Sequence, residues 1–305
     1  MYDKGDLRSA LTKDSAAAPK APAATEFAGA DHARFYEEPP QDTGPQGKTW
    51  YARGQNFVIA YSETEPGARF TRENQLDEYV LILPDTETGA TVTAGSRTET
   101  VPGYSLVIVP PGDSAIEIPD GGRIVRLFSS ENADLAAKCS NADSYARRHP
   151  NIPPFERWSD PPGGFKIRQY SLDVPGQEGR FGRIFRCTTF MVNYIDPQIG
   201  PRDTTKLSPH FHDDFEQCSL ALAGAYMHHL RWPWTIDMNT WRDDEHAYCK
   251  APSITVIPPP SIHTSRGVDP ELNQLVDIFS PPRIDFSKQP GWVLNADDYP
   301  VPPVQ

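Results

Sequence analysis

The sequence contains few cysteines, a minority of basic residues and no long apolar run, and each shortage argues against a class of protein. The four cysteines among 305 residues form no CxxC pair, so we expect reduced thiols and a cytoplasmic location rather than a disulfide framework. No stretch approaches the roughly 18 uncharged apolar residues of a membrane helix. The first 15 residues alternate charges without the apolar centre of a secretory signal. We therefore expect no contact with a membrane.

Basic residues are outnumbered, because 29 Lys and Arg face 41 Asp and Glu and give a formal charge of −12. Such a surface repels a phosphate backbone, so nucleic acid is not an expected partner. Proline is abundant, with 32 residues, which is about twice its usual share. Proline interrupts helix interiors and central strands, so long helical bundles are unfavourable and short strands joined by loops are favoured.

Proline-rich segments divide the chain. Residues 1–45 are rich in Ala and Pro near residue 20, and are predicted to be an N-terminal extension. Residues 141–165 contain two Pro-Pro pairs and are predicted to be a linker. This division predicts one domain over 46–140, a second over 166–285 and a C-terminal tail over 286–305.

The two halves resemble each other in sequence. Four runs recur in the same order: 51–61 with 184–194, 78–83 with 216–222, 106–112 with 254–260, and 127–130 with 278–281. Each half consists of short β-rich runs cut by Gly, Pro and Asp turns, which favours an all-β sandwich or barrel. The only helices expected are short ones near 131–139 and 142–148.

Three histidines and a glutamate of the second half have a distinctive arrangement. His210 and His212 are separated by one residue, so a strand would place both rings on one face. Glu216 follows at the start of an apolar run, and His263 follows three prolines. An isolated His-x-His pair is most often a solvated strand surface. Here the internal repeat gives Glu216 and His263 defined positions, and imidazoles with one carboxylate suit Fe, Mn, Ni, Cu or Zn.

These residues resemble the two motifs of the cupin superfamily. The first motif is carried by His210, His212, Glu216 and Gly224, and the second by Pro258 and His263, with Pro260 where glycine is common. Together with the repeat, the chain resembles a bicupin over residues 46–285. That resemblance implies an all-β fold of two tandem double-stranded β-helix (jelly-roll) barrels.

The resemblance implies one divalent transition metal per chain, held in the C-terminal barrel by His210, His212, Glu216 and His263. Iron is expected ahead of Mn, Ni or Zn. The N-terminal half has Arg72, Asn74, Glu78 and Ala115 at the aligned positions. One carboxylate cannot hold a transition metal, so the first barrel is predicted to be metal-free and to serve as a structural unit, a dimerisation surface or a pocket without metal.

The function expected first is an O₂-dependent dioxygenase that acts on a small organic acid or aromatic compound. A non-oxidative isomerase, lyase or decarboxylase is the alternative, and a non-catalytic binding protein is the second alternative. Tyr226 and His228 share a strand face and are candidate acid–base groups. Trp232, Trp234 and Trp241 are candidates for covering the pocket mouth, or for packing between the barrels. A homodimer remains an open alternative.

Overall fold

The computed structural model of the chain describes residues 26–235 and 237–302. The all-β prediction is confirmed, because strands make up nearly all of its regular structure. The helices α1 (Ala133–Ala136) and α2 (Ile284–Ser287) have four residues each. Two further 3₁₀ turns are η3 (Ala142–Tyr145) and η4 (Met238–Thr240). The described chain contains no helical segment with the length and hydropathy of a membrane span.

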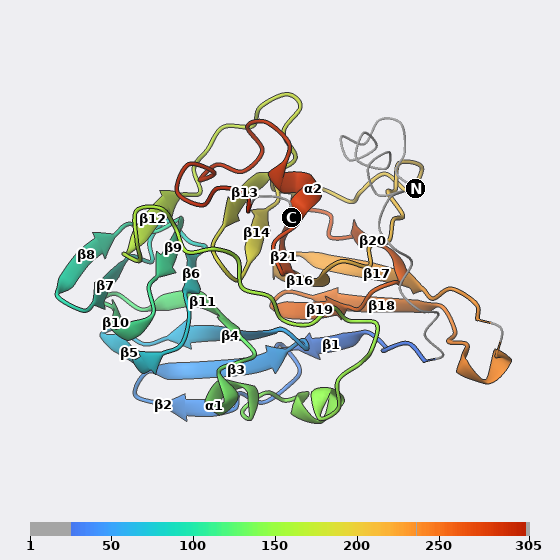
Figure 1. Cartoon of the computed structure of the whole chain (residues 1–305), viewed down its shortest axis with the longest axis horizontal. Coiled ribbons are helices and arrows are strands. Elements are labelled where there is room, and N and C mark those ends of the chain that lie inside the picture. The colour runs from blue at the N-terminus through green and yellow to red at the C-terminus, as the bar shows by residue number, and fades with distance from the viewer. Residues whose placement is uncertain (1–25, 236, 303–305) are drawn as a thin grey trace.

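The strands form two barrels in tandem, each built from a large and a small antiparallel sheet (Figure 1). In the first barrel the large sheet has the order β12-β9-β6-β11-β4-β3-β2, and the small sheet has the order β5-β10-β7-β8. The large-sheet strands are β2 (Asp42–Gly44), β3 (Gly47–Arg53), β4 (Phe57–Thr64), β6 (Tyr79–Leu83), β9 (Ser105–Val109), β11 (Gly122–Ser129) and β12 (Arg168–Ser171). The small-sheet strands are β5 (Ala68–Gln75), β7 (Ala90–Ala94), β8 (Arg97–Val101) and β10 (Gly112–Ile118).

The second barrel repeats this plan with a large sheet of order β1-β19-β16-β21-β14-β13 and a small sheet of order β18-β17-β20. Its large sheet contains β1 (Asp31–Arg34), β13 (Arg183–Arg186), β14 (Met191–Tyr194), β15 (Gln198–Ile199), β16 (Glu216–Ala223), β19 (Ser253–Ile257) and β21 (Leu272–Ser280). The small sheet contains β17 (Ala225–Arg231), β18 (Glu245–Lys250) and β20 (Ile262–Gly267). Gly224 joins β16 to β17 at a φ of 76°, a conformation that glycine adopts without strain.

Each barrel receives a strand from the segment that precedes the other barrel. β1 pairs with β19, with Asp31 opposite Val256, and β12 pairs with β9, with Arg168 opposite Ile108. The expected domain limits are corrected accordingly. Residues 26–45 are not an extension: they contain β1, which belongs to the large sheet of the second barrel, and β2, which belongs to that of the first. Residues 168–171 belong to the first barrel. The remainder of the expected extension, residues 1–25, lies outside the described residues.

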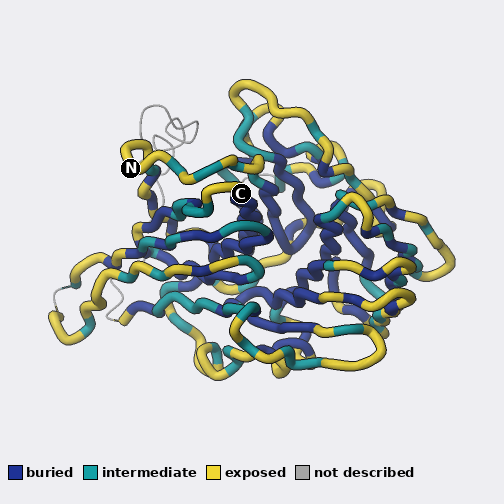
Figure 2. The backbone as a smooth tube through the Cα atoms, turned by 180° about the vertical axis from the view of Figure 1, so that it is seen from behind, coloured by how far each residue is buried: buried dark blue, intermediate teal, exposed yellow. Residues whose placement is uncertain are grey.

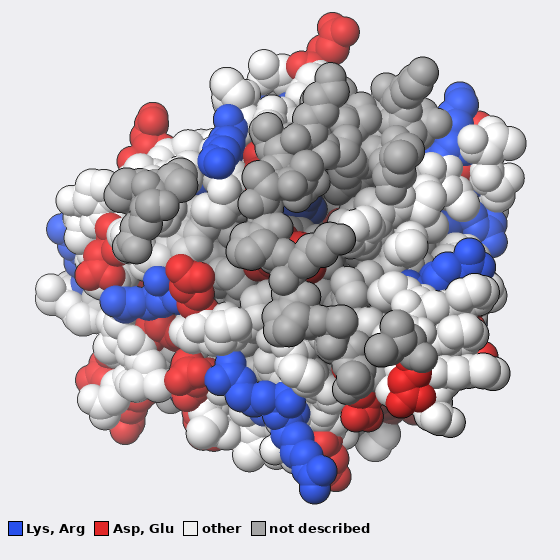
Figure 3. Space-filling view, turned by 45° about the vertical axis from the view of Figure 1, so that its right-hand side comes forward, with Lys and Arg blue, Asp and Glu red and all other residues white. Residues whose placement is uncertain are grey.

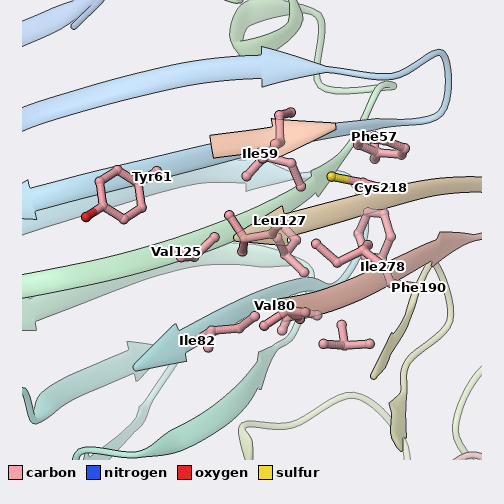
Figure 4. Close-up of a cluster of buried hydrophobic side chains, with 14 of the residues drawn as sticks. Phe57, Ile59, Tyr61, Val80, Ile82, Val125, Leu127, Phe190, Cys218 and Ile278 are labelled. Carbon is pink, nitrogen blue, oxygen red and sulfur yellow. The ribbon is translucent and has the colours of Figure 1, made fainter. Parts of the chain in front are cut away.

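The large sheets of the two barrels face each other across a shared core. One cluster of buried side chains joins β4, β6 and β11 of the first barrel to β16 and β21 of the second. Figure 4 shows Ile59, Val80 and Leu127 pointing toward Cys218 and Ile278. Every residue of β6, β9 and β19 is buried, because each of these strands contacts the shared core on one face and a barrel interior on the other. Figure 2 shows the same central strands as the most deeply buried part of the chain.

The interior of the first barrel is filled with apolar side chains. A second cluster includes Tyr79, Leu81, Val107 and Phe128, all 1% exposed or less. The Tyr79 and Phe128 rings stack with centroids 4.9 Å apart. This barrel therefore has a solid core where the second barrel has a polar cavity, described below.

The C-terminal tail and the linker both hold the barrels together. Tyr299 donates its hydroxyl hydrogen to Glu78 Oε1 at 2.6 Å, which ties the tail to the first barrel. The Asn56 side-chain amide donates to the Pro153 carbonyl of the linker at 2.8 Å. Residues 286–302 are thus packed against the body of the molecule.

Candidate metal centre

His210 and His263 are brought together by a backbone bridge. The His210 N–H donates to the His263 carbonyl at 3.1 Å, and the His263 N–H donates to the His210 carbonyl at 2.8 Å. His263 lies on β20, the strand that pairs with β17. The barrel therefore closes at this point through the two segments that carry the histidine motifs.

The three predicted histidines form one buried cluster. Their ring centroids are 4.4 Å apart for His210 and His263, 5.1 Å for His212 and His263, and 6.4 Å for His210 and His212. No residue of the cluster is more than 7% exposed. The fold thus places His263 beside His210 and His212, which are about 50 residues earlier in the sequence, as the motif resemblance implied.

The Nδ1 atom of each ring is committed to a backbone carbonyl. The pairs are His210 with Ser208 at 2.8 Å, His263 with Ser261 at 3.0 Å, and His212 with Phe215 at 3.1 Å. A carbonyl can only accept, so Nδ1 carries the proton in each ring and Nε2 presents a lone pair when the ring is neutral. Burial holds the pKa of His212 well below its ordinary value, so this ring is neutral. Histidines that bind metals are usually anchored in this way through the other ring nitrogen.

Glu216, the expected fourth ligand, does not lie beside the histidines. Its carboxylate accepts the backbone N–H groups of Gln55 and Asn56, at 2.8 and 2.9 Å, on the first barrel. An added Cβ on Gly54 would lie 2.7 Å from the Glu216 carboxyl carbon, so a residue without a side chain permits this approach. The expectation that Glu216 is a ligand is corrected: its side chain connects the two barrels.

The alternation of side chains along β16 explains why Glu216 does not face the histidines. Glu216 and Cys218 face the shared core, whereas Gln217 and Ser219 face the interior of the barrel. Cys218, two residues after Glu216 and on the same strand face, is correspondingly in the shared core. A shift of one residue reverses the face of every side chain on a strand.

Gln217 occupies the position beside the histidines. Its Oε1 lies 3.1 Å from Nε2 of His212. Its Nε2 donates to Asp277 Oδ1 at 3.3 Å, and the Ser219 hydroxyl donates to the same oxygen at 2.7 Å. Gln217, Ser219 and Asp277 form a buried polar group on neighbouring strands β16 and β21, and sequence reasoning missed all three.

A cavity of about 450 Å³ opens onto this group. Its lining includes His210, His263, Gln217, Asp277 and Tyr226. The cavity is large enough for a small organic molecule, and its walls combine imidazole, amide, carboxylate and phenol groups.

The two candidate acid–base residues have different positions. Tyr226 lines the cavity, and burial raises the pKa of its hydroxyl, so the phenol keeps its proton at neutral pH. His228 is 1% exposed and is not part of the cavity lining. Its Nδ1 lies 2.8 Å from the hydroxyl of Ser265, which does line the cavity. Burial lowers the pKa of His228 to about 3, so this ring is neutral.

The tryptophans do not cover the cavity. Trp232 is buried against Phe27 and Leu230 and donates its indole N–H to the Ala28 carbonyl. Trp234 and Trp241 stack on each other, with centroids 4.6 Å apart, in the loop after β17. Among the described residues, the cavity lining includes none of the three. The suggestion that they cover the pocket mouth is therefore corrected.

In the first barrel, different residue types occupy the positions aligned with His210 and Gln217. Arg72, aligned with His210, forms an ion pair with Asp134 at 2.6 Å. Tyr79, aligned with Gln217, bonds through its hydroxyl to Ser114 at 3.0 Å. Glu78, aligned with Glu216, accepts from Thr188 of the second barrel. The carboxylate shared by both halves thus serves the contact between barrels in both.

The residues of the second barrel fit a divalent metal in their donor chemistry. Three imidazoles with committed Nδ1 atoms have ring centroids 4.4 to 6.4 Å apart, and one amide oxygen lies beside His212. These donors suit the later first-row metals. In the part of the chain that the structure describes, no three His, Cys, Asp or Glu side chains are already at metal-ligand spacing. The oxygen that lies beside His212 is the amide oxygen of Gln217, where the motif resemblance implied a carboxylate.

Comparison with known proteins supports the architecture. The chain matches no protein-family model and none of the curated proteins. Among solved structures, it is similar to the formate complex of Lactobacillus farciminis oxalate decarboxylase, with a TM-score of 0.58 and 13% identity over 85% of this chain and 89% of that one. A single-residue variant of Bacillus subtilis oxalate decarboxylase gives a TM-score of 0.54 and 11% identity over 86% and 79% of the two chains.

A further oxalate decarboxylase structure, concerned with proton-coupled electron transfer, gives a TM-score of 0.54 and 12% identity over 92% of this chain and 84% of that one. Identities this low establish the fold. The protein has a bicupin fold, with two tandem barrels, as the sequence motifs and the internal repeat implied.

Proposed function

We propose that the C-terminal barrel binds one divalent transition metal and that the protein is a metal-dependent cupin enzyme. The observation that carries this proposal is the cluster of three buried imidazoles, each with Nδ1 held by a backbone carbonyl, two of which (His210 and His263) line a cavity. His210, His212 and His263 would hold the ion, with Gln217 beside them. The first barrel serves as a structural unit, because apolar side chains fill its interior.

The reaction that we propose is non-oxidative: a decarboxylation, lyase or isomerase reaction on a small carboxylic acid. A bound divalent ion supplies Lewis acidity that polarises a carboxylate or carbonyl oxygen. Tyr226 is placed to donate a hydrogen bond or a proton to a substrate in the cavity, because its hydroxyl remains protonated at neutral pH. The likeness in fold to oxalate decarboxylases adds support and suggests oxalate as the first acid to test.

An O₂-dependent oxidation of an organic acid or aromatic compound is the second candidate. It is favoured by the three-imidazole donor set, which suits Fe(II) as well as Mn, Ni or Zn. Oxygen consumption separates the two candidates, since only the second requires O₂.

A small molecule, rather than nucleic acid, is the proposed ligand. The net charge of −12 opposes binding to phosphate backbones. On the face drawn in Figure 3, acidic side chains accompany the basic ones across the described surface. A cytoplasmic location stays part of the proposal, since all four cysteines are buried and free of disulfides.

The test is a turnover assay on protein loaded separately with Mn(II), Fe(II), Ni(II) and Zn(II). Oxalate and other small mono- and dicarboxylic acids are supplied with and without oxygen, and CO₂ release and dissolved O₂ are followed. Turnover under anaerobic conditions, lost in His263→Ala and reduced in Tyr226→Phe, is the expected result. Turnover that stops without oxygen would establish the second candidate. A protein that binds none of the four metals would refute both.

A further inference from the structure

We propose that Gln217 is the oxygen ligand of the centre and that Asp277 is its positioning residue, which holds the amide with Oε1 toward the histidines. This inference rests on the proposed metal function and concerns how the chain builds the fourth protein donor without a carboxylate. The observation behind it is the hydrogen-bonded series from Ser219 through Asp277 and Gln217 to His212.

The orientation of the Gln217 amide is fixed by its neighbours. A carboxylate oxygen is an acceptor, so the side of the amide that faces Asp277 must be the NH₂ group. The Ser219 hydroxyl donates to the same Asp277 oxygen and keeps the carboxylate in place. With Nε2 committed at 3.3 Å, the amide can only present Oε1 to the histidines.

The resulting contact joins two acceptors. His212 donates through Nδ1 to the Phe215 carbonyl, so its Nε2 carries a lone pair, and Oε1 of Gln217 lies 3.1 Å away. Two lone pairs at this distance repel unless a cation is shared.

Asp277 also explains why the ligand is an amide. A glutamate at position 217 would place a second carboxylate beside Asp277, and like charges so close disfavour the ionised form of both. Gln217 donates one hydrogen bond to Asp277 and presents an oxygen on its other side. The negative charge of the centre is thereby held one hydrogen bond away from the metal and strengthens the amide oxygen as a donor.

The first barrel shows that the fold does not need this arrangement. Its aligned residues are Tyr79 for Gln217, Leu81 for Ser219 and Arg126 for Asp277. The strands pair in the same way, since Arg126 lies opposite Leu81 as Asp277 lies opposite Ser219. A barrel of the same architecture is thus completed with an apolar residue, a phenol and a cation at these positions. The Gln–Ser–Asp group is specific to the barrel with the histidines.

The test measures the affinity for Co²⁺ by calorimetry and by the visible absorption of the bound ion. Gln217→Ala and Asp277→Ala are each expected to weaken Co²⁺ binding by about 10- to 100-fold. Because Asp277 acts through Gln217, the double variant Q217A/D277A should bind no more weakly than Q217A alone. The exchange Q217E/D277N, which moves the charge onto the ligand, should restore binding and shift the absorption bands.

Three results would overturn the inference. They are wild-type affinity in Asp277→Ala, a further loss when Asp277→Ala is added to Gln217→Ala, and an absorption spectrum that Gln217→Ala leaves unchanged. If the alanine variant of Asp277 does not fold, Asp277→Asn replaces it. That variant keeps the shape but allows the amide to turn, and it must also bind Co²⁺ more weakly than the wild type. Wild-type protein that binds no Co²⁺ would instead refute the proposed function.

Discussion

Replacing Glu216 by alanine should cost stability and leave metal binding intact. The motif pattern makes this residue a ligand, whereas in the structure both carboxylate oxygens accept backbone N–H groups of the other barrel. Glu216 is fully buried, so water cannot take over these contacts once the side chain is removed. The variant therefore separates a role in holding the barrels together from a role in holding an ion.

The expected magnitude follows from the two donors left behind. A buried N–H without an acceptor costs about 1–3 kcal/mol, so the loss at Gln55 and Asn56 together is about 2–6 kcal/mol. That is a large part of the roughly 5–15 kcal/mol by which folded domains are stable. Glu216→Gln keeps one acceptor and loses the other, so about half of the effect is expected.

Thermal unfolding and Co²⁺ titration of the same samples give the two readouts. Glu78→Ala is the matched control, because Glu78 makes the equivalent contact to Thr188 from the barrel without histidines. Gln217→Ala is the opposite control, with weakened Co²⁺ binding and a smaller fall in unfolding temperature than Glu216→Ala, because it removes one donor from Asp277 rather than both acceptors of two backbone N–H groups. A Glu216→Ala protein that loses Co²⁺ while keeping wild-type stability would refute the assignment of its role.

Three further predictions concern the histidines, the asymmetry of the barrels and pH. His263→Ala should lose the metal and activity but keep the fold, because its bridge to His210 uses only backbone atoms; full metal occupancy in the variant would remove His263 from the ligands. Elemental analysis of reconstituted protein should give one transition metal per chain, and two would contradict a metal-free first barrel. Burial raises the pKa of Glu78 above its usual 4.5, so the folded chain holds its proton more tightly than the unfolded chain. Its contribution to stability should therefore fall as the pH rises from 4.5 through the raised pKa. Urea unfolding of wild type and Glu78→Gln between pH 4 and 8 should show a smaller decline for the variant, and parallel curves would contradict the shift.

The architecture could be predicted from the sequence because it is repeated. Proline and turn residues cut both halves into short apolar runs, and four runs recur in the same order. Each recurring run proved to lie on strands in equivalent places: the first pair of runs spans two strands in each half, and the third corresponds to β9 and β19. The three histidines could be predicted because two of them are separated by one residue and the third follows shortly after run 254–260, which has a counterpart in the first half.

The face of the fourth donor could not be predicted from the same pattern. Glu216 and Gln217 begin a strand that is buried on both sides, so neither apolar alternation nor burial distinguishes its two faces. The repeat contained a signal, because Glu78 survives in the half that lacks every histidine. A carboxylate retained without the other ligands indicates a role in the fold, and the residue after it becomes the candidate ligand.

The domain limits could not be predicted from the sequence for a different reason. β1 and β12 are four residues long and pair with strands that lie more than 50 residues away in the chain. Local composition describes their surroundings as extension and linker, and only the tertiary pairing makes them strands. A short segment whose partner is distant has little local signal, because its stability comes from the sheet that it joins.

The exchanged strands and the paired glutamates also explain how one barrel could change without the other. β1 and β12 attach each half to the opposite sheet, and Glu78 and Glu216 bind backbone amides across the same interface. All of these contacts lie on the faces directed toward the shared core or at sheet edges. The interior faces are consequently free to differ, and they hold apolar side chains and Arg126 in the first barrel but a polar cavity with Asp277 in the second. The strand faces toward the shared core thus hold the two barrels together, whereas the interior faces carry the residues of the candidate site.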